Sequence, residues 1–172
     1  INIPDTTGVG TPTRFHNLVS EIRGWTDARV DVHAHDDFGL ATANAIAGFE
    51  AGAAQAQVSV NGIGERAGNA AYEEVVMAAE ALFGVETGIE TRRITELSRI
   101  VEAASDIPVP QNKSIVGQNA FSHESGIHAA GVLENSDTFE PGVMTPEMVG
   151  ASREFVLGKH TGTHSVRQRL VE

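Results

Sequence analysis

The sequence contains no cysteine. Disulfide bonds and thiolate metal ligands are therefore excluded, so any metal site must use imidazole, carboxylate, amide or water ligands. The chain also lacks an apolar run of about 18 residues and a signal-peptide pattern, the features that predict a membrane span or export. We therefore expect a cytoplasmic protein with no membrane partner.

The chain is poor in basic residues. Its 12 lysine and arginine residues, of which only Lys113 and Lys159 are lysines, stand against 23 aspartate and glutamate residues, and the formal net charge is −11 at pH 7. A negative surface repels the phosphates of nucleic acids and anionic lipids, so neither is expected as a partner. The acid-rich, lysine-poor composition is typical of a high-salt cytoplasm, and it fits a simply acidic protein equally well.

The length of 172 residues, 41% of them hydrophobic, suits one domain with a sizeable core or a piece of a larger domain. The first residues indicate a piece of a larger domain. Ile1, Asn2 and Ile3 alternate as in a strand already under way, and no initiator methionine precedes them. We therefore expect a fragment of a longer protein.

Strand and helix patterns alternate in the first half of the chain. The expected elements are strands at 1–3, 30–32 and 54–60 and helices at about 12–23, 41–51 and 70–82. Three repeats of strand, loop and helix are typical of right-handed βαβ units and a parallel sheet, and hence of an α/β fold. In such folds the ligand site lies where the strands end and the βα loops begin.

The pattern changes from about residue 91. A helix is expected over 92–104, a polar cluster within a helix over 118–134, and a short turn capped by Thr145. No strand is expected after about residue 85. The second half is therefore predicted to be a helical extension.

The stretch 30–41 carries the candidate site. His33 and His35 alternate at the end of a strand and so point to the same side, where two imidazoles can bind one divalent cation. Asp36 and Asp37 could act as further ligands or orient the histidines. For an isolated His-x-His, a pair of histidines held in ordinary polar hydrogen bonds is about equally plausible, because short motifs match by chance. The position at a strand end, beside other polar loops, favours the metal.

Four motifs then stand in a fixed order, and the tail adds a fifth. They are Pro4-Asp5-Thr6, His33-Ala34-His35-Asp36-Asp37-Phe38-Gly39, Gly62-Ile63-Gly64-Glu65-Arg66-Ala67-Gly68-Asn69, Ser122-His123-Glu124-Ser125-Gly126-Ile127-His128 and Leu157-Gly158-Lys159-His160-Thr161-Gly162. Together they resemble the metal-dependent acyl-CoA Claisen condensation enzymes, the family of 2-isopropylmalate, citramalate and homocitrate synthases. The resemblance implies that residues 1–88 are the C-terminal portion of a TIM (β/α)8 barrel, its last three βα units, and that 89–172 form a helical linker or subdomain.

The resemblance also implies an activity and a site. The enzyme would condense acetyl-CoA with a 2-oxo acid, 2-oxoisovalerate giving 2-isopropylmalate in leucine biosynthesis, and hydrolyse the thioester to release CoA. His33, His35 and Asn69 match residues at the divalent metal, which is Mn, Zn, Mg or Co. Thr6 matches a contact to the substrate carboxylate, and His128 matches a histidine of acid-base catalysis. The family architecture implies a homodimer in which the helical segment of one subunit lies over the barrel mouth of the other.

Several alternatives stay open. Citramalate or homocitrate could be the product, and an inactive dimerisation or scaffold fragment is the alternative from another class. We expect the isolated chain to be inactive, because the family's Asp-Arg-Glu stretch and a catalytic glutamate would lie upstream of Ile1. Phe139 stands where many members have tyrosine, so no hydroxyl role is expected there. Glu65 and Arg66 are expected to pair with each other and fix their loop, at about two to one over a substrate contact.

Overall fold

The computed structural model describes residues 1–123 and 143–155. The chain divides into two compact units, Ile1–Ile89 and Glu90–Glu172. The candidate residues Thr6, His33, His35 and Asn69 all belong to the first unit. His128 lies outside the described residues.

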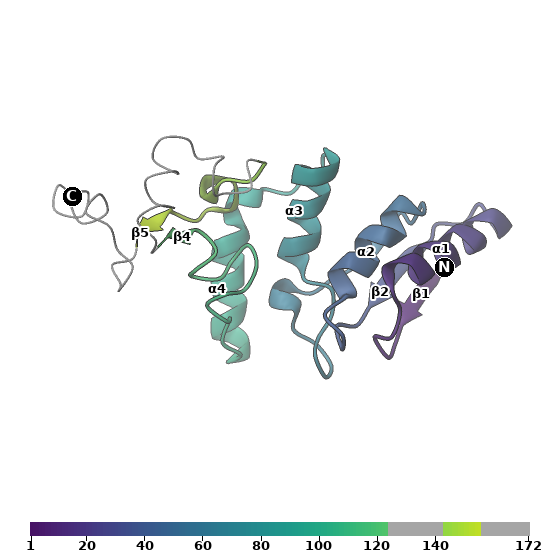
Figure 1. Ribbon diagram of the computed structural model, residues 1–172, viewed down its shortest axis with the longest axis horizontal. Helices are drawn as coiled ribbons and strands as arrows, with labels where there is room; N and C mark the ends of the chain where they lie inside the picture. The colour runs from purple at the N-terminus through teal and green to yellow at the C-terminus, as the bar shows by residue number, and fades with distance from the viewer. Residues whose placement is uncertain (124–142, 156–172) are drawn as a thin grey trace. The chain divides into compact units, whose positions relative to one another are not determined.

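Three parallel strands form the sheet of the first unit (Figure 1). They are β1 (Asn2–Asp5), β2 (Asp31–Ala34) and β3 (Gln55–Gln57), hydrogen-bonded in chain order. Helices α1 (Pro12–Trp25) and α2 (Ala41–Glu50) make the crossovers, and α3 (Tyr72–Phe83) follows β3. Parallel neighbours require such crossovers. The predicted α/β fold with successive βα units is confirmed.

The core of the first unit contains side chains from the sheet and the helices. Val32 and Ala34 alternate with His33 along β2 and are buried. Two apolar clusters form, one of Ile3, Phe15, Val19, Val30, Val32 and Ala53 and one of Ala34, Ala41, Ala45, Ala70 and Val75. A Cβ on Gly48 of α2 would lie 3.0 Å from Cγ1 of Val32, so the absence of a side chain there lets the helix approach the sheet.

The opposite face of the sheet is polar. Asn2, Asp31 and Gln55 lie in one row of the register, and His33 and Gln57 are partners in a neighbouring row. The Asp31 carboxylate accepts hydrogen bonds from Nδ2 of Asn2 at 2.6 Å and Nε2 of Gln57 at 3.0 Å. The bond from Asn2 is the main cause that lowers the pKa of Asp31. His33 therefore belongs to a polar layer and not to the apolar core.

Cap residues account for the start of α1 and the end of α3, but α1 ends later than predicted. The Thr11 side chain accepts a hydrogen bond from the Arg14 amide, and α1 begins at Pro12, the residue at which the helix was expected to start. The helix was expected to end at about residue 23, before Gly24, but α1 continues to Trp25. A glycine stop requires a left-handed backbone, and Gly24 has no positive φ. By contrast, Gly84 after α3 has φ 65° and ends that helix.

Strand β3 is shorter than predicted. A strand was expected over 54–60, but β3 covers only Gln55–Gln57, and the 3-10 helix η1 (Val60–Gly62) follows it closely. Asn61 in η1 has φ 62°, and its amide donates to a carboxylate oxygen of Glu73 at 2.9 Å. The chain therefore turns out of the sheet where the β-branched pattern predicts that the strand continues.

The second unit contains two strands that were not expected. The 3-10 helix η2 (Thr91–Arg93) leads into α4 (Ile94–Ser105), and the 3-10 helix η4 (Pro146–Val149) follows Thr145. Strands β4 (Ser122–His123) and β5 (Glu154–Phe155) pair in parallel, so the prediction of no strand after residue 85 is wrong. The helix predicted over 118–134 is wrong for residues 118–123, and the rest of it lies outside the described residues. Two-residue strands carry no readable alternation.

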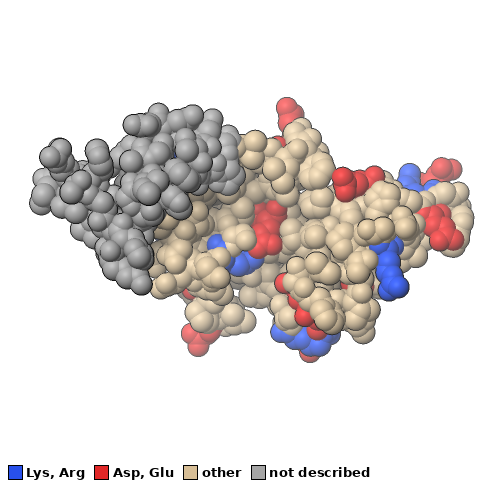
Figure 2. Space-filling view, viewed as in Figure 1, with Lys and Arg blue, Asp and Glu red and all other residues tan. Residues whose placement is uncertain are grey.

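Charge is spread over the surface without a basic tract on the face shown in Figure 2. Acidic side chains of the described residues occupy several separate places there, and basic side chains lie singly or in small groups. No helix in the ranges 1–123 and 143–155 has the length and apolar character needed to cross a membrane.

Candidate functional site

The histidine pair stands at the carboxyl end of β2. His33 lies within the strand, and His35 follows it and forms a backbone bridge with Asn69. The two Nε2 atoms are 3.2 Å apart, and the ring planes meet at 77° with centroids 4.9 Å apart. Neutral imidazole nitrogens are common ligands of divalent ions such as zinc, and these two nitrogens are close enough for one ion to bind both. The spacing thus suits two ligands of one ion.

Hydrogen bonding in this pair is incomplete. Nδ1 of His33, Nδ1 of His35 and Oδ1 of Asn69 are buried and have no hydrogen-bond partner among the described residues. Between two neutral imidazoles one Nε2 donates and the other accepts. This hydrogen bond uses two of the four ring nitrogens and leaves both Nδ1 atoms without a partner among the described residues. A buried polar atom without a partner costs about 1–3 kcal/mol. The two Nε2 atoms that face each other and the unpartnered Asn69 oxygen are ligand types that suit a cation binding nitrogen and oxygen, whereas the two Nδ1 atoms are not part of that donor set.

The two aspartates that follow the histidines have other partners. Oδ1 of Asp36 accepts a hydrogen bond from the Ala41 amide at 2.8 Å, at the start of α2. Asp37 binds Arg66, and no hydrogen bond joins either carboxylate to His33 or His35. The described residues hold no group of three or more histidine, aspartate or glutamate side chains that could surround an ion. The expectation that these aspartates ligate the metal or orient the histidines is not met.

Arg66 was predicted to pair with its neighbour Glu65. In the structure it pairs with Asp37 instead. Its Nε and Nη2 donate to the two carboxylate oxygens of Asp37, each at 2.8 Å, and Nη2 also donates to the carbonyl of Thr6 at 2.8 Å. This hydrogen bonding is the main cause that lowers the pKa of Asp37 and raises that of Arg66. The prediction that Arg66 fixes its loop is met with a different partner, 29 residues away in the chain.

The loop from Gly62 to Asn69 folds tightly upon itself. The Asn69 amide donates to the Gly62 carbonyl at 3.0 Å, and Nδ2 of Asn69 donates to the Ile63 carbonyl at 3.3 Å. Gly68 has φ 97°, and a Cβ on it would collide with the Gly62 carbonyl oxygen. The absence of a side chain at Gly68 therefore permits the tight turn. With its amide nitrogen held in this way, Asn69 has Oδ1 left for a ligand.

Thr6 lies in the loop after β1 and is exposed. The Asp5 side chain holds this loop, because its carboxylate accepts from the Val9 amide at 3.2 Å and the Gly10 amide at 2.9 Å. Buried Asn44 donates through Nδ2 to the Gly10 carbonyl at 2.9 Å. Neither Asp5 nor Asn44 was predicted to support this loop. An aspartate directly after a strand and before a glycine loop was the available signal for Asp5.

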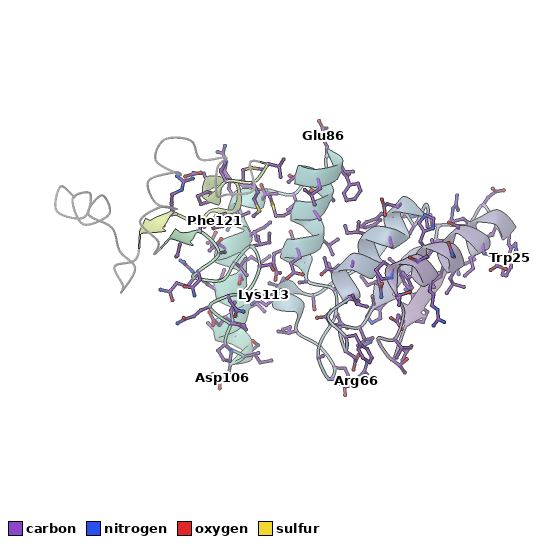
Figure 3. The ribbon with its side chains drawn as sticks, in the orientation of Figure 1. Trp25, Arg66, Glu86, Asp106, Lys113 and Phe121 are labelled. Atoms are coloured by element: carbon purple, nitrogen blue, oxygen red, sulfur yellow. The ribbon has the colours of Figure 1, made fainter. Side chains whose placement is uncertain are left out.

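The loops after the three strands are also joined through the backbone. The His35 amide donates to the Asp5 carbonyl at 3.4 Å, and the Asp36 amide donates to the Gly68 carbonyl at 2.9 Å. In Figure 3, Arg66 is labelled at the edge of the first unit where these loops gather. The structure therefore brings Thr6, the histidine pair and Asn69 to one edge of the sheet. Glu124, Phe139, Lys159 and His160 lie outside the described residues, and the side chain of His123 is not described.

Two family models match the chain. The model described as HMGL-like matches residues 1–101, and the model described as homocitrate synthase post-HMGL domain-like matches residues 115–172. The first covers the sheet, the helices and the histidine pair of the first unit. The second includes His128.

Curated relatives match over nearly the whole chain. A probable 2-isopropylmalate synthase of Methanosarcina acetivorans is 54% identical over 99% of this chain and 33% of its own length. A 2-isopropylmalate synthase of Sulfurisphaera tokodaii is 55% identical over 100% of this chain and 44% of its own. A putative (R)-citramalate synthase of Methanopyrus kandleri is 55% identical over 96% of this chain and 33% of its own. The chain thus spans about a third to under a half of these proteins.

Solved structures share the fold. An HMG-CoA lyase of Acinetobacter baumannii, in complex with coenzyme A and 3-methylmalate, aligns over 64% of this chain and 38% of its own with a TM-score of 0.58 and 27% identity. The HMG-CoA lyase of Bacillus subtilis aligns over 63% of this chain and 39% of its own with a TM-score of 0.57 and 23% identity. The predicted fold, part of a TIM barrel followed by a helical part, is confirmed.

Proposed function

The chain belongs to the HMGL-like family, and from this premise we propose that it is part of an acyltransferase that condenses acetyl-CoA with a 2-oxo acid. The proposed acceptor is 2-oxoisovalerate and the product 2-isopropylmalate, a step of leucine biosynthesis. The names of the relatives support this choice. The observation that carries it is the pair of imidazole Nε2 atoms 3.2 Å apart at the carboxyl end of β2.

The proposed metal ligands are His33, His35 and Asn69. Two nitrogens and one amide oxygen favour Zn, Mn or Co, whereas Mg prefers oxygen ligands throughout. A bound divalent ion would supply Lewis-acid polarisation of the 2-oxo group. The chain's own part is to hold both rings with their Nε2 atoms together and to keep the Asn69 oxygen free while its nitrogen donates to Ile63.

Substrate placement is assigned to the loop after β1. The Thr6 hydroxyl would donate a hydrogen bond to the substrate carboxylate. Its loop is braced by the Asp5 carboxylate and by Arg66, which donates to the Thr6 carbonyl. An exposed hydroxyl on a braced loop can orient a substrate with little loss of its own freedom.

The remaining roles concern residues outside the described ranges. His128 is proposed to move protons in the acid-base steps, for which imidazole is suited near neutral pH. We propose residues 1–88 as the C-terminal portion of the barrel domain and 89–172 as the helical linker or subdomain. The complete enzyme is proposed to be a cytoplasmic homodimer, with the helical segment of one subunit over the barrel mouth of the other.

The experiment measures CoA release with a thiol reagent from the chain extended to the full length of its relatives. Acetyl-CoA is offered with 2-oxoisovalerate, pyruvate or 2-oxoglutarate, and 2-oxoisovalerate is expected to give the highest kcat/KM. His33→Ala and His35→Ala are expected to lower kcat/KM by about 100-fold or more. His16→Ala is the matched control, because His16 lies on α1, and it is expected to keep full activity.

A second candidate has its own support. The Methanopyrus kandleri relative bears the name citramalate synthase, and the second family model is described by homocitrate synthase. A preference for pyruvate would assign the citramalate reaction, and a preference for 2-oxoglutarate the homocitrate reaction. No CoA release with any of the three acids would overturn the acyltransferase and leave a binding or scaffold role.

A further inference from the structure

Arg66 joins three loops at the carboxyl edge of the sheet. It stands in the loop after β3, binds both carboxylate oxygens of Asp37 in the loop after β2, and donates to the Thr6 carbonyl in the loop after β1. All three distances are 2.8 Å. A guanidinium that binds a carboxylate through two parallel hydrogen bonds fixes direction as well as distance. These contacts define the loop clamp: Arg66, Asp37 and the Thr6 carbonyl.

Close packing between two of the loops is independent of this arginine. Gly8 in the loop after β1 has φ 65°, and a Cβ placed on it would lie 2.9 Å from the Cβ of Asp37 and 3.0 Å from its amide nitrogen. The two loops therefore approach to a distance that only glycine permits. The loop after β3 is also joined to the loop after β2 without Arg66, because the Asp36 amide donates to the Gly68 carbonyl at 2.9 Å. Arg66 adds a direct hydrogen bond from the loop after β3 to the loop after β1.

The loop clamp adds little to the stability of the fold, and the backbone conformation of Arg66 has an energetic cost. The side chain of Arg66 is 42% exposed, and ion pairs at that exposure stabilise a fold little. Arg66 also has φ 55°, in the left-handed region that a residue with a side chain adopts only at an energetic cost. Strained residues of this kind are typical of sites where geometry matters more than stability.

The clamp acts on residues that the proposed function uses. Thr6, the proposed substrate contact, is held through its own carbonyl. Asp37, two residues beyond His35, is held through its carboxylate. The backbone of His35 is held separately, by the Asp5 carbonyl. Loss of Arg66 should therefore release the substrate-binding loop more than the histidine pair.

We propose that Arg66 is a positioning residue that holds the Thr6 loop against the loop of Asp37 for binding of the 2-oxo acid. This inference rests on the proposed function and adds a residue to it. Arg66 does not touch the substrate in this account. It acts through Thr6, so its removal should change the KM for the 2-oxo acid and leave divalent-ion binding in place.

Arg66→Gly separates positioning from stability, because glycine removes the clamp and also relieves the left-handed strain. In the full-length enzyme the KM for the 2-oxo acid is expected to rise about 10–100-fold, with kcat and the Mn²⁺ affinity within about threefold of wild type and Tm unchanged or higher. Hydrogen exchange at the amides of Gly8 to Gly10 is expected to accelerate. Arg66→Lys, which keeps the charge but not the fork, should give an intermediate KM.

Two further variants serve as controls for the effect of Arg66→Gly on KM. Arg93→Ala breaks a comparable exposed pair, Arg93–Glu96 at 3.1 Å, and is expected to leave KM and the exchange of Gly8 to Gly10 unchanged. Asp37→Ala combined with Arg66→Gly should raise KM no further than Arg66→Gly alone, because both remove one clamp.

Either of two results would overturn the positioning role: an unchanged KM in Arg66→Gly, or unchanged exchange at Gly8 to Gly10. A wild-type enzyme without turnover would instead defeat the proposed function, and the exchange measurement would still decide whether Arg66 holds the loop.

Discussion

At the scale of single residues, the site is defined by polar atoms that lack partners. The two imidazole Nδ1 atoms and the Asn69 oxygen are buried and have no hydrogen bond in the described part of the chain, although neighbouring groups are well bonded. The Asn69 nitrogen, both Asp37 oxygens and the Thr6 carbonyl all have partners at 2.8–3.3 Å. Three unpartnered atoms among the described residues therefore belong to the candidate site, and one more, Oδ1 of buried Asn44, belongs to a residue of α2 that supports the loop after β1.

Tyr72 offers a test of local burial. It is the only tyrosine of the chain, and burial, followed by the charge of Glu80, raises the pKa of its phenol. The fold favours the neutral phenol, so this contribution to stability is present below the unfolded-state pKa and is lost as pH rises through the folded pKa. The phenolate absorbance that Tyr72→Phe removes is expected to titrate above about pH 10 in the folded protein and near 10 in urea. Equal midpoints would contradict the burial of this side chain.

The sequence predicts some of these residues and not others, for a physical reason. The two-residue spacing of His33 and His35 at a strand end requires both rings to lie on one side, and the structure brings them together. The partner of Arg66 was predicted wrongly, because Asp37 is 29 residues away and only the folded loops bring the two into contact. The roles of His33, His35, Asn69, Thr6 and His128 in binding and catalysis stay predictions.

At the scale of elements, the close contact between α2 and β2 is testable with two glycines. Gly48→Ala places a Cβ 3.0–3.1 Å from the Val32 methyl groups, and the overpacking is expected to cost about 1–3 kcal/mol. Gly24→Ala in α1 meets nothing within 4 Å at a position without positive φ, so it is expected to stabilise by about 0.5–1 kcal/mol. Urea unfolding of both variants checks the pair. Equal effects of the two substitutions would contradict the described packing.

Long helices could be predicted from the sequence, and two-residue strands could not. Helices α1, α2, α3 and α4 follow from apolar residues at helical spacing, with ends within a few residues of those expected. Strands β4 and β5 have two residues each, and their pairing joins segments about 30 residues apart. Such a pair depends on tertiary contacts that no local pattern contains.

At the scale of the whole molecule, the sheet of the first unit has open edges. Among the described residues, β1 and β3 each pair only with β2. Unpaired strand edges bind other strands, so the isolated 172-residue chain is expected to self-associate. Light scattering during size-exclusion chromatography should give a mass above the 18.2 kDa of one chain. A stable monomer without tendency to associate would show that the edges are covered in another way.

The same reasoning predicts that the isolated chain does not turn over substrate. It spans 33–44% of the length of the relatives named above, and three strands do not close a barrel. CoA release by the isolated chain, assayed beside the full-length enzyme with acetyl-CoA and 2-oxoisovalerate, is expected to be at background. Turnover by the chain alone would show that these residues contain a complete catalytic site.

The central claim is that two imidazoles at the end of β2 share one divalent ion. X-ray absorption at the zinc edge of the zinc-loaded full-length protein tests it most directly, with the His33→Ala, His35→Ala double variant beside the wild type. The wild-type spectrum is expected to show imidazole nitrogens at about 2.0–2.1 Å from the metal, with the contribution of two rings lost in the double variant. Identical imidazole scattering in the two proteins, or none in the wild type, would contradict the claim.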